Sequence, residues 1–193
     1  MLKMKKRLCI VFLVLLLAVT GVCPAFADDE SASDLASNFE MFMMLSGKKC
    51  TRLEKGQVIF STMDFDTEVV QVDHVTEDNV QIPIEYQFFD FAGGNTTLHF
   101  AVVKAALPGS AFGMTDENVM YCLFGNDYLN RYANLGRFYL TQDESGKWYV
   151  EMRYDLMLEP GSAGKVCYGV LNLLEKDIDE AVKDLKDLLS SYQ

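Results

Sequence analysis

The sequence predicts an α+β fold, in which an antiparallel β-sheet is accompanied by an N-terminal helix, a middle helix and a long C-terminal helix. Apolar residues have helical spacing near the beginning, in the middle and at the end of the chain, and segments that alternate every second residue lie between them. The alternating segments follow one another through short turns, which favours antiparallel pairing. The length fits a single α+β domain, residues 34–193.

The first 27 residues have the three parts of a secretory signal peptide: a basic start, an uncharged apolar run and an Ala-x-Ala cleavage site that ends at Ala27. We therefore expect the mature chain to begin at Asp28 and to be secreted or extracytoplasmic. An uncleaved membrane anchor is the alternative, because the uncharged segment is about as long as a spanning helix. Pro24 favours cleavage over a continuous helix. Residues 28–33 are acidic, small or polar and are predicted to be a disordered lead-in.

The composition is strongly acidic. The chain has 17 basic and 28 acidic residues, which gives a net charge of −11. All four charges of the predicted signal peptide are basic, so the mature chain has 13 basic residues and a net charge of −15. Nucleic acids and anionic membranes are bound through clustered lysine and arginine. We therefore expect no nucleic-acid partner, and no membrane binding after signal cleavage.

The first predicted helix spans residues 34–45, with Ser33 or Asp34 as its N-cap. Its apolar stripe consists of Leu35, Phe39, Phe42 and Met43. Met41 and Met44 lie outside this stripe, so the helix has apolar surface on more than one side.

Four strands are predicted to follow, at residues 57–63, 69–75, 81–88 and 96–106. In the third, every second residue from Ile82 to Phe88 is apolar. Pro83 within it cannot donate a backbone hydrogen bond, which predicts an edge strand or the beginning of a strand. Phe88, Phe89 and Phe91 break the alternation, and we expect at least one of them to face outward.

The last part of the chain predicts a helix over residues 115–134, a hairpin from 137–141 and 147–158, and a closing helix over 163–189. The second hairpin strand alternates between an apolar and a polar face, which predicts a sheet with one wet face. The closing helix has apolar residues at three- and four-residue steps, which resembles a coiled-coil seam. Because this pattern spans barely three heptads, packing on the sheet is favoured over a coiled coil.

A resemblance to a known family is carried by three segments: residues 126–131 (NDYLNR), 135–140 (LGRFYL) and 143–156, which ends in GKWYVEMRYDL. Together they resemble the YbjN-like family of small bacterial domains, whose fold is similar to that of type III secretion chaperones. The resemblance covers about residues 115–190, and this sequence has one strand more than the family pattern. It implies a binding or chaperone-like module, and it carries over no catalytic residue.

Motifs for catalysis or metal binding are few. His74 and His99 lie on separate predicted strands, each without partners at ligand spacing. The tract Asp64-x-Asp66-x-Glu68 begins like a calcium loop but lacks the required glycine and the closing glutamate. We therefore predict no catalytic residue, no metal and no cofactor. The alternatives to a simple binding module are a small-ligand-binding protein, or an enzyme whose site forms only in three dimensions.

Three cysteines remain after signal cleavage. Cys122 lies in an apolar helical segment and is predicted to be buried. Cys50 follows Lys48 and Lys49, a basic setting that lowers a thiol pKa, so Cys50 is the candidate reactive thiol. A disulfide between Cys50 and Cys167 is the alternative.

The candidate interface combines the first helix with neighbouring strand residues: Phe39, Met41, Phe42, Met44, Phe89 and Phe91. Methionine-rich apolar surfaces adapt to several partners. The alternative is a helix that the domain itself buries on two sides. The sequence thus predicts a secreted, non-enzymatic binding module, chaperone-like or regulatory, that takes a protein partner or a second copy of itself.

Overall fold

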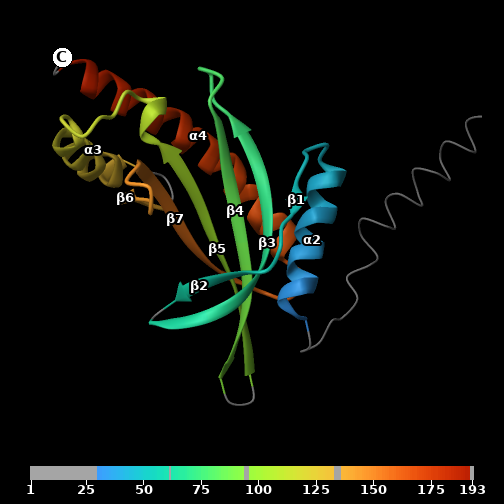
Figure 1. Ribbon diagram of the computed structural model, residues 1–193. Coiled ribbons are helices and arrows are strands. Elements are labelled where there is room, and N and C mark those ends of the chain that lie inside the picture. Colours follow the sequence, from blue (N-terminus) through green and yellow to red (C-terminus); the bar gives the residue numbers. More distant parts are fainter. Residues whose placement is uncertain (1–29, 61, 94–95, 133–135, 192–193) are drawn as a thin grey trace, which may run out of the picture.

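The computed structural model describes residues 30–60, 62–93, 96–132 and 136–191. The predicted signal peptide, residues 1–27, lies outside this part. The described chain forms a seven-stranded antiparallel sheet and three α-helices, N-terminal, middle and long C-terminal, so the predicted α+β fold is confirmed (Figure 1). Within the described part, no helix is long and apolar enough to span a membrane.

The elements follow one another with short connections: α2 (Ala32–Leu45), β1 (Thr51–Arg52), β2 (Gly56–Phe60), β3 (Met63–Val75), β4 (Gln81–Gly93), β5 (Thr96–Pro108), the 3-10 turn η1 (Gly109–Ala111), α3 (Val119–Tyr132), β6 (Arg137–Gln142), β7 (Trp148–Leu158) and α4 (Ala163–Ser190). The strand order is β1-β3-β4-β5-β7-β6, and β2 pairs with β3 beyond the end of β1. All pairs are antiparallel, as the short connections predict.

One face of the sheet, here called the helix face, is covered by α2 and α4 (Figure 1). Alternate residues of β4 point to this face and are fully buried: Ile82, Ile84, Tyr86 and Phe88. The ring of Phe39 from α2 lies 4.4 Å from that of Tyr86, measured between centroids. The Tyr86 hydroxyl donates a hydrogen bond of 3.1 Å to the Cys167 carbonyl of α4. One buried tyrosine therefore joins the sheet to both helices.

The other face, here called the open face, carries a second and smaller cluster. Glu68 is the first residue of β3 that pairs with β4, and the residues of β3 before it pair with β2. The β2–β3 hairpin folds over the open face, so that the rings of Phe60 and Phe65 lie 5.3 and 4.8 Å from that of Phe89. This hairpin cluster consists of Val58, Phe60, Phe65, Phe89, Phe100 and Val102.

Several predicted boundaries move for local reasons. α2 begins at Ala32 because Ser31 and Asp34 form a capping box, so the predicted cap at Ser33 or Asp34 is wrong, and residues 32 and 33 of the predicted lead-in are helical. Residues 28 and 29 of that lead-in lie outside the described part. α3 begins at Val119, four residues late, because the Asn118 side chain accepts a hydrogen bond from the Thr115 backbone and holds a turn. Residues 133–135, within the predicted end of this helix, lie outside the described part.

The acidic tract from Asp64 to Glu68, which lies between two of the predicted strands, is the first half of one continuous strand, β3. Pro83 lies in an interior strand, so the prediction of an edge is wrong. It is, however, paired only with Asp73 of β3, because the pairing of β4 with β5 begins one residue later. The alternative prediction, that Pro83 lies at the beginning of a strand, is therefore correct for the pairing of β4 with β5. The hairpin β6–β7 and the closing helix α4 agree with the sequence within two residues.

Candidate interaction surfaces

The structure divides the predicted interface. Phe39 and Phe89 are fully buried, in the main core and in the hairpin cluster, so their prediction as interface residues is wrong. Successive residues of a strand point to opposite faces, and the sequence does not show that the hairpin covers the second face as well. Phe91 is half-buried beside Phe65, at a centroid distance of 6.0 Å.

The outer side of α2 is exposed as predicted at two positions. Met41 is 52 % exposed and Met44 is 70 % exposed. Phe42, in contrast, is half-buried because its ring packs 5.4 Å from that of Tyr168 in α4. The helix and strand residues that were expected to form one surface therefore lie on opposite faces of the sheet.

A second apolar surface continues from the hairpin cluster and was not predicted. Met157 of β7 lies opposite Phe100 of β5, whose ring lies 5.0 Å from that of Phe60, and Phe60 pairs with Met63. We call these four residues the apolar strip. At its two ends, Met157 is 71 % exposed and Met63 is 46 % exposed. Beside the strip, Ile59 is 64 % exposed.

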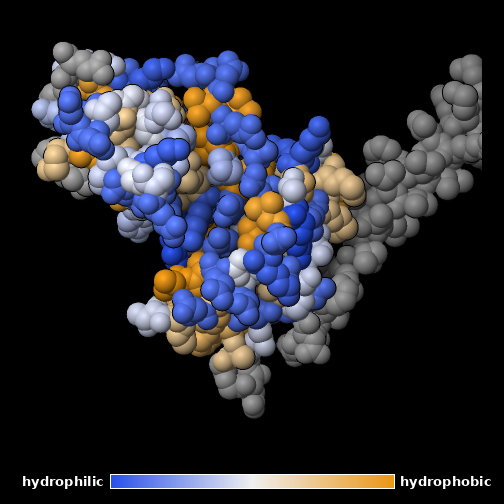
Figure 2. Space-filling view, in the orientation of Figure 1, coloured by the Kyte–Doolittle hydropathy of each residue, from blue (hydrophilic) through white to orange (hydrophobic). Residues whose placement is uncertain are grey.

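Three basic residues lie side by side on the same face. Lys104 of β5 is directly opposite Arg153 of β7, and Arg153 is directly opposite Arg137 of β6. We call them the cation row. Figure 2 views the molecule from this side and shows hydrophilic residues across the middle of the face and apolar residues beside the end of β2. The row adjoins the hairpin, because the Arg153 guanidinium donates a hydrogen bond of 3.1 Å to the Ile59 carbonyl and one of 2.9 Å to Asp155.

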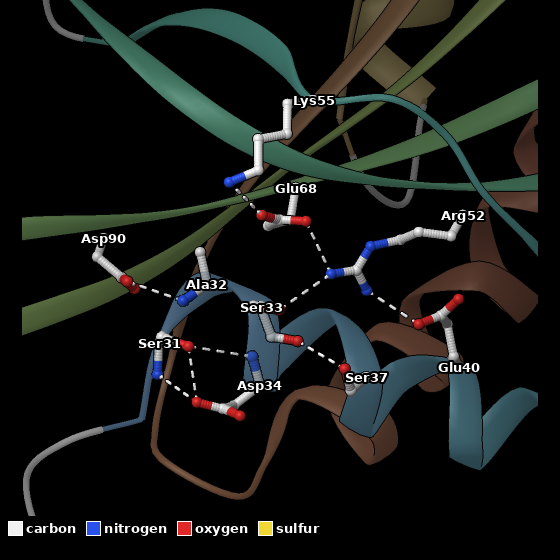
Figure 3. Close-up of polar contacts among 10 residues, drawn as sticks. All are labelled: Ser31, Ala32, Ser33, Asp34, Ser37, Glu40, Arg52, Lys55, Glu68 and Asp90. Atoms are coloured by element: carbon white, nitrogen blue, oxygen red, sulfur yellow. Dashed lines mark hydrogen bonds and ion pairs between the residues drawn. The ribbon is translucent and has the colours of Figure 1, made fainter.

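A polar cluster fixes α2 to the sheet at the point where β3 leaves it (Figure 3). The Asp90 carboxylate accepts a hydrogen bond of 2.7 Å from the Ala32 backbone N–H, at the helix N-terminus, and lies 2.9 Å from Nδ1 of His99. Arg52 bridges Glu40 of α2 and Glu68 of β3, at 2.9 and 2.8 Å.

These contacts have an electrostatic consequence for Glu68. Hydrogen bonds from Arg52 and then from Lys55 stabilise its ionised form and lower its pKa. The charged groups of this cluster bind one another and the helix N-terminus. The arrangement therefore positions α2 rather than a substrate.

Both histidines have acidic partners that are distant in sequence. Besides the contact of His99 with Asp90, Nε2 of His74 lies 2.9 Å from Asp179 of α4. Next to His74, Lys48 Nζ is 2.7 Å from a Glu175 carboxylate oxygen. The local sequence offers neither histidine such a partner; sheet register and helix packing supply both. Among the residues that the structure describes, no group of three His, Cys, Asp or Glu side chains could hold a metal ion.

The described cysteines are not bridged, so the alternative of a Cys50–Cys167 disulfide is not adopted. Cys50 is half-buried beside the Lys48–Glu175 pair, in an open cavity of about 480 Å³. Burial, and then the charge of Glu40, raise the pKa of its thiol, so the predicted lowering of this pKa is wrong. Burial also raises the pKa of Cys122 to about 11 and that of Cys167 to about 12.

No model of a known protein family matches this chain, and no curated protein matches it. The open face and the exposed side of α2 therefore have to be judged on their chemistry alone.

Proposed function

We propose that the mature chain is a secreted, non-enzymatic module that binds a protein partner, or a second copy of itself, through the open face of the sheet. The observation that carries this proposal is the apolar strip. Met157 is 71 % exposed and Met63 is 46 % exposed where they continue a cluster of phenylalanines, and Ile59 is 64 % exposed on the outer side of the same hairpin. Burial of such apolar surface by a partner stabilises a complex, and flexible methionines fit irregular surfaces.

A small-ligand site is less well supported. A cavity outside the open face lies beside Cys50, and two of its charged groups already pair within the protein, Lys48 with Glu175 and His74 with Asp179. A ligand would have to break these pairs. An enzymatic site would also need groups free to act on a substrate, and the same pairing opposes this alternative.

The resemblance to YbjN-like domains and to secretion chaperones remains part of the proposal. A sheet with one face covered by helices, followed by a long closing helix, is compatible with it. A chaperone-like role would use exposed apolar surface to hold a protein segment, which agrees with the strip. The extracytoplasmic location rests on the signal-peptide pattern of residues 1–27.

The proposal is tested by site-specific photo-crosslinking in cells that produce the full chain. A photoreactive residue in place of Ile59 should give a discrete adduct, whose mass distinguishes a partner from a second copy. The same residue in place of Leu173, an exposed apolar position on α4, is the control and should give none. Adducts at Met44 and not at Ile59 would assign binding to α2 and contradict the proposal.

A further inference from the structure

The cation row is unusual in this chain. Its three members come from three neighbouring strands and stand directly opposite one another, where side chains are about 5 Å apart at Cβ. Like charges at such positions are destabilising. Only 13 basic residues remain after removal of the predicted signal peptide, against 28 acidic ones. Three adjacent basic residues are therefore a local exception in an acidic chain.

The positive charge of the row is only partly neutralised within the protein. Arg153 binds Asp155, but the Arg137 guanidinium donates to a backbone carbonyl, that of Gly136. Lys104 has no ion pair with any residue in the described ranges, although Glu85 lies opposite it on β4. A carboxylate from outside the molecule could therefore bind Lys104 or Arg137 without displacing an internal ion pair.

The row also has a fixed relation to the apolar strip. Arg153 and Met157 lie on the same face of β7, four residues apart, which corresponds to about 13 Å along a strand. Arg153 joins the two regions by holding the Ile59 carbonyl of the hairpin. An extended segment that places carboxylates on the row would reach the strip with apolar residues about four positions away.

We infer that the protein segment bound by the open face is acidic, with apolar residues about four positions from its carboxylates. This inference rests on the proposed function and specifies the partner. Because the chain as a whole is acidic, the attraction is local and acts within about 10 Å at moderate salt. Binding is therefore weaker at high salt, although the apolar contacts remain.

The test uses the mature chain, residues 28–193, and a labelled synthetic peptide with three glutamates followed, four residues later, by two leucines. Binding is measured by fluorescence anisotropy at low and at high salt. The variant Lys104→Glu with Arg137→Glu should bind the peptide about ten times more weakly. The control variant, Lys165→Glu with Lys183→Glu on the exposed side of α4, makes the same charge change and should bind as the unmodified chain does.

Three results would overturn the inference: no binding of the peptide, equal binding of a peptide with serines in place of the glutamates, and displacement of the peptide by inorganic phosphate, which would indicate a small-anion site. The Ile59 adduct in cells distinguishes failure of the acidic-segment inference from failure of the proposed function. If the adduct persists in the Lys104→Glu, Arg137→Glu variant, the open face still binds a partner, and only the inference that this partner is acidic is contradicted. If the unmodified chain gives no adduct, both the proposed function and the inference about the partner are contradicted.

Discussion

The two faces of the sheet are covered in different ways. On the helix face, the helices bury most of the apolar strand residues, and Tyr86 hydrogen-bonds across the core. On the open face, one folded hairpin covers a smaller buried cluster that includes Val58, Phe89 and Val102, and the remaining surface has an apolar strip and a cation row. Adjacent residues of β4, Phe88 and Phe89, are fully buried on opposite sides. The comparison indicates that the helix face supplies most of the stability and leaves the open face available for binding.

The largest expected effect contrasts an aromatic residue on each face. Phe39→Ala should lower the free energy of unfolding by about 3–5 kcal/mol, because it leaves a cavity against Tyr86 and Phe88 in the main core. Phe65→Ala in the half-covered hairpin cluster should cost about 1–2 kcal/mol, since less apolar area is lost from burial. Urea denaturation of both variants measures the difference, and equal losses would contradict the division between the faces.

The next effect concerns the close approach of the two helices on the helix face. A Cβ atom at Gly164 of α4 would lie 2.6 Å from the Asn38 side-chain oxygen and 2.8 Å from Cβ of Phe42. Gly164→Ala should therefore lower the free energy of unfolding by about 1–3 kcal/mol.

The matched control for this variant is Gly169→Ala on the same helix. A Cβ atom there would meet nothing within 4 Å, so the higher helix propensity of alanine should stabilise the protein by about 0.5–1 kcal/mol. Thermal unfolding of both variants gives the comparison, and the same sign of change in both would show that the helix–helix spacing is not the cause.

A smaller, pH-dependent effect is expected where α2 is fixed to the sheet. Arg52 and Lys55 lower the pKa of Glu68 from its ordinary value of 4.5. Its ionised form thus stabilises the folded protein above pH 4.5, and this contribution is lost as the pH falls through the lowered pKa. The difference in unfolding free energy between the unmodified chain and Glu68→Gln should accordingly be largest near neutral pH and disappear in acid. A difference independent of pH would mean that packing rather than charge is lost.

The smallest expected effect is on thiol chemistry. All three thiols have raised pKa values, so a thiol reagent should modify the native protein slowly near neutral pH. Cys50 should be labelled first, because Cys122 and Cys167 are fully buried, and its rate should rise with pH. Mass spectrometry of a labelling time course identifies the order. Rapid modification of Cys50 at neutral pH would show that its local environment differs from the one described.

The elements that the sequence predicts well are those with local signals. The β6–β7 hairpin shows its alternation and turn within a short segment, and α4 shows its apolar spacing along its whole length. Because the hairpin fixes its own register, it also places Arg137 opposite Arg153. That Lys104 lies beside these two arginines could not be predicted from the sequence, because it depends on the pairing of β5 with β7, which are separated in the chain by α3.

What the sequence did not predict depends on long-range packing. The folding of β2 and β3 over the open face leaves no local pattern, so Phe89 looked exposed although it is buried. The acidic partners of the histidines are likewise invisible locally, because Asp179 is 105 residues from His74. For the candidate site, the exposure of Met41 and Met44 was foreseeable from helical spacing, whereas the strip through Met157 was not.

The central claim, that the helix face holds the fold and the open face binds, is tested most directly by one double variant. Met63→Gln with Met157→Gln is assayed for the free energy of unfolding and for the Ile59 photo-adduct. Exposed positions tolerate such changes within about 0.5 kcal/mol, so the variant should remain as stable as the unmodified chain and lose the adduct. A large loss of stability with the adduct intact would place these methionines in the core and contradict the claim.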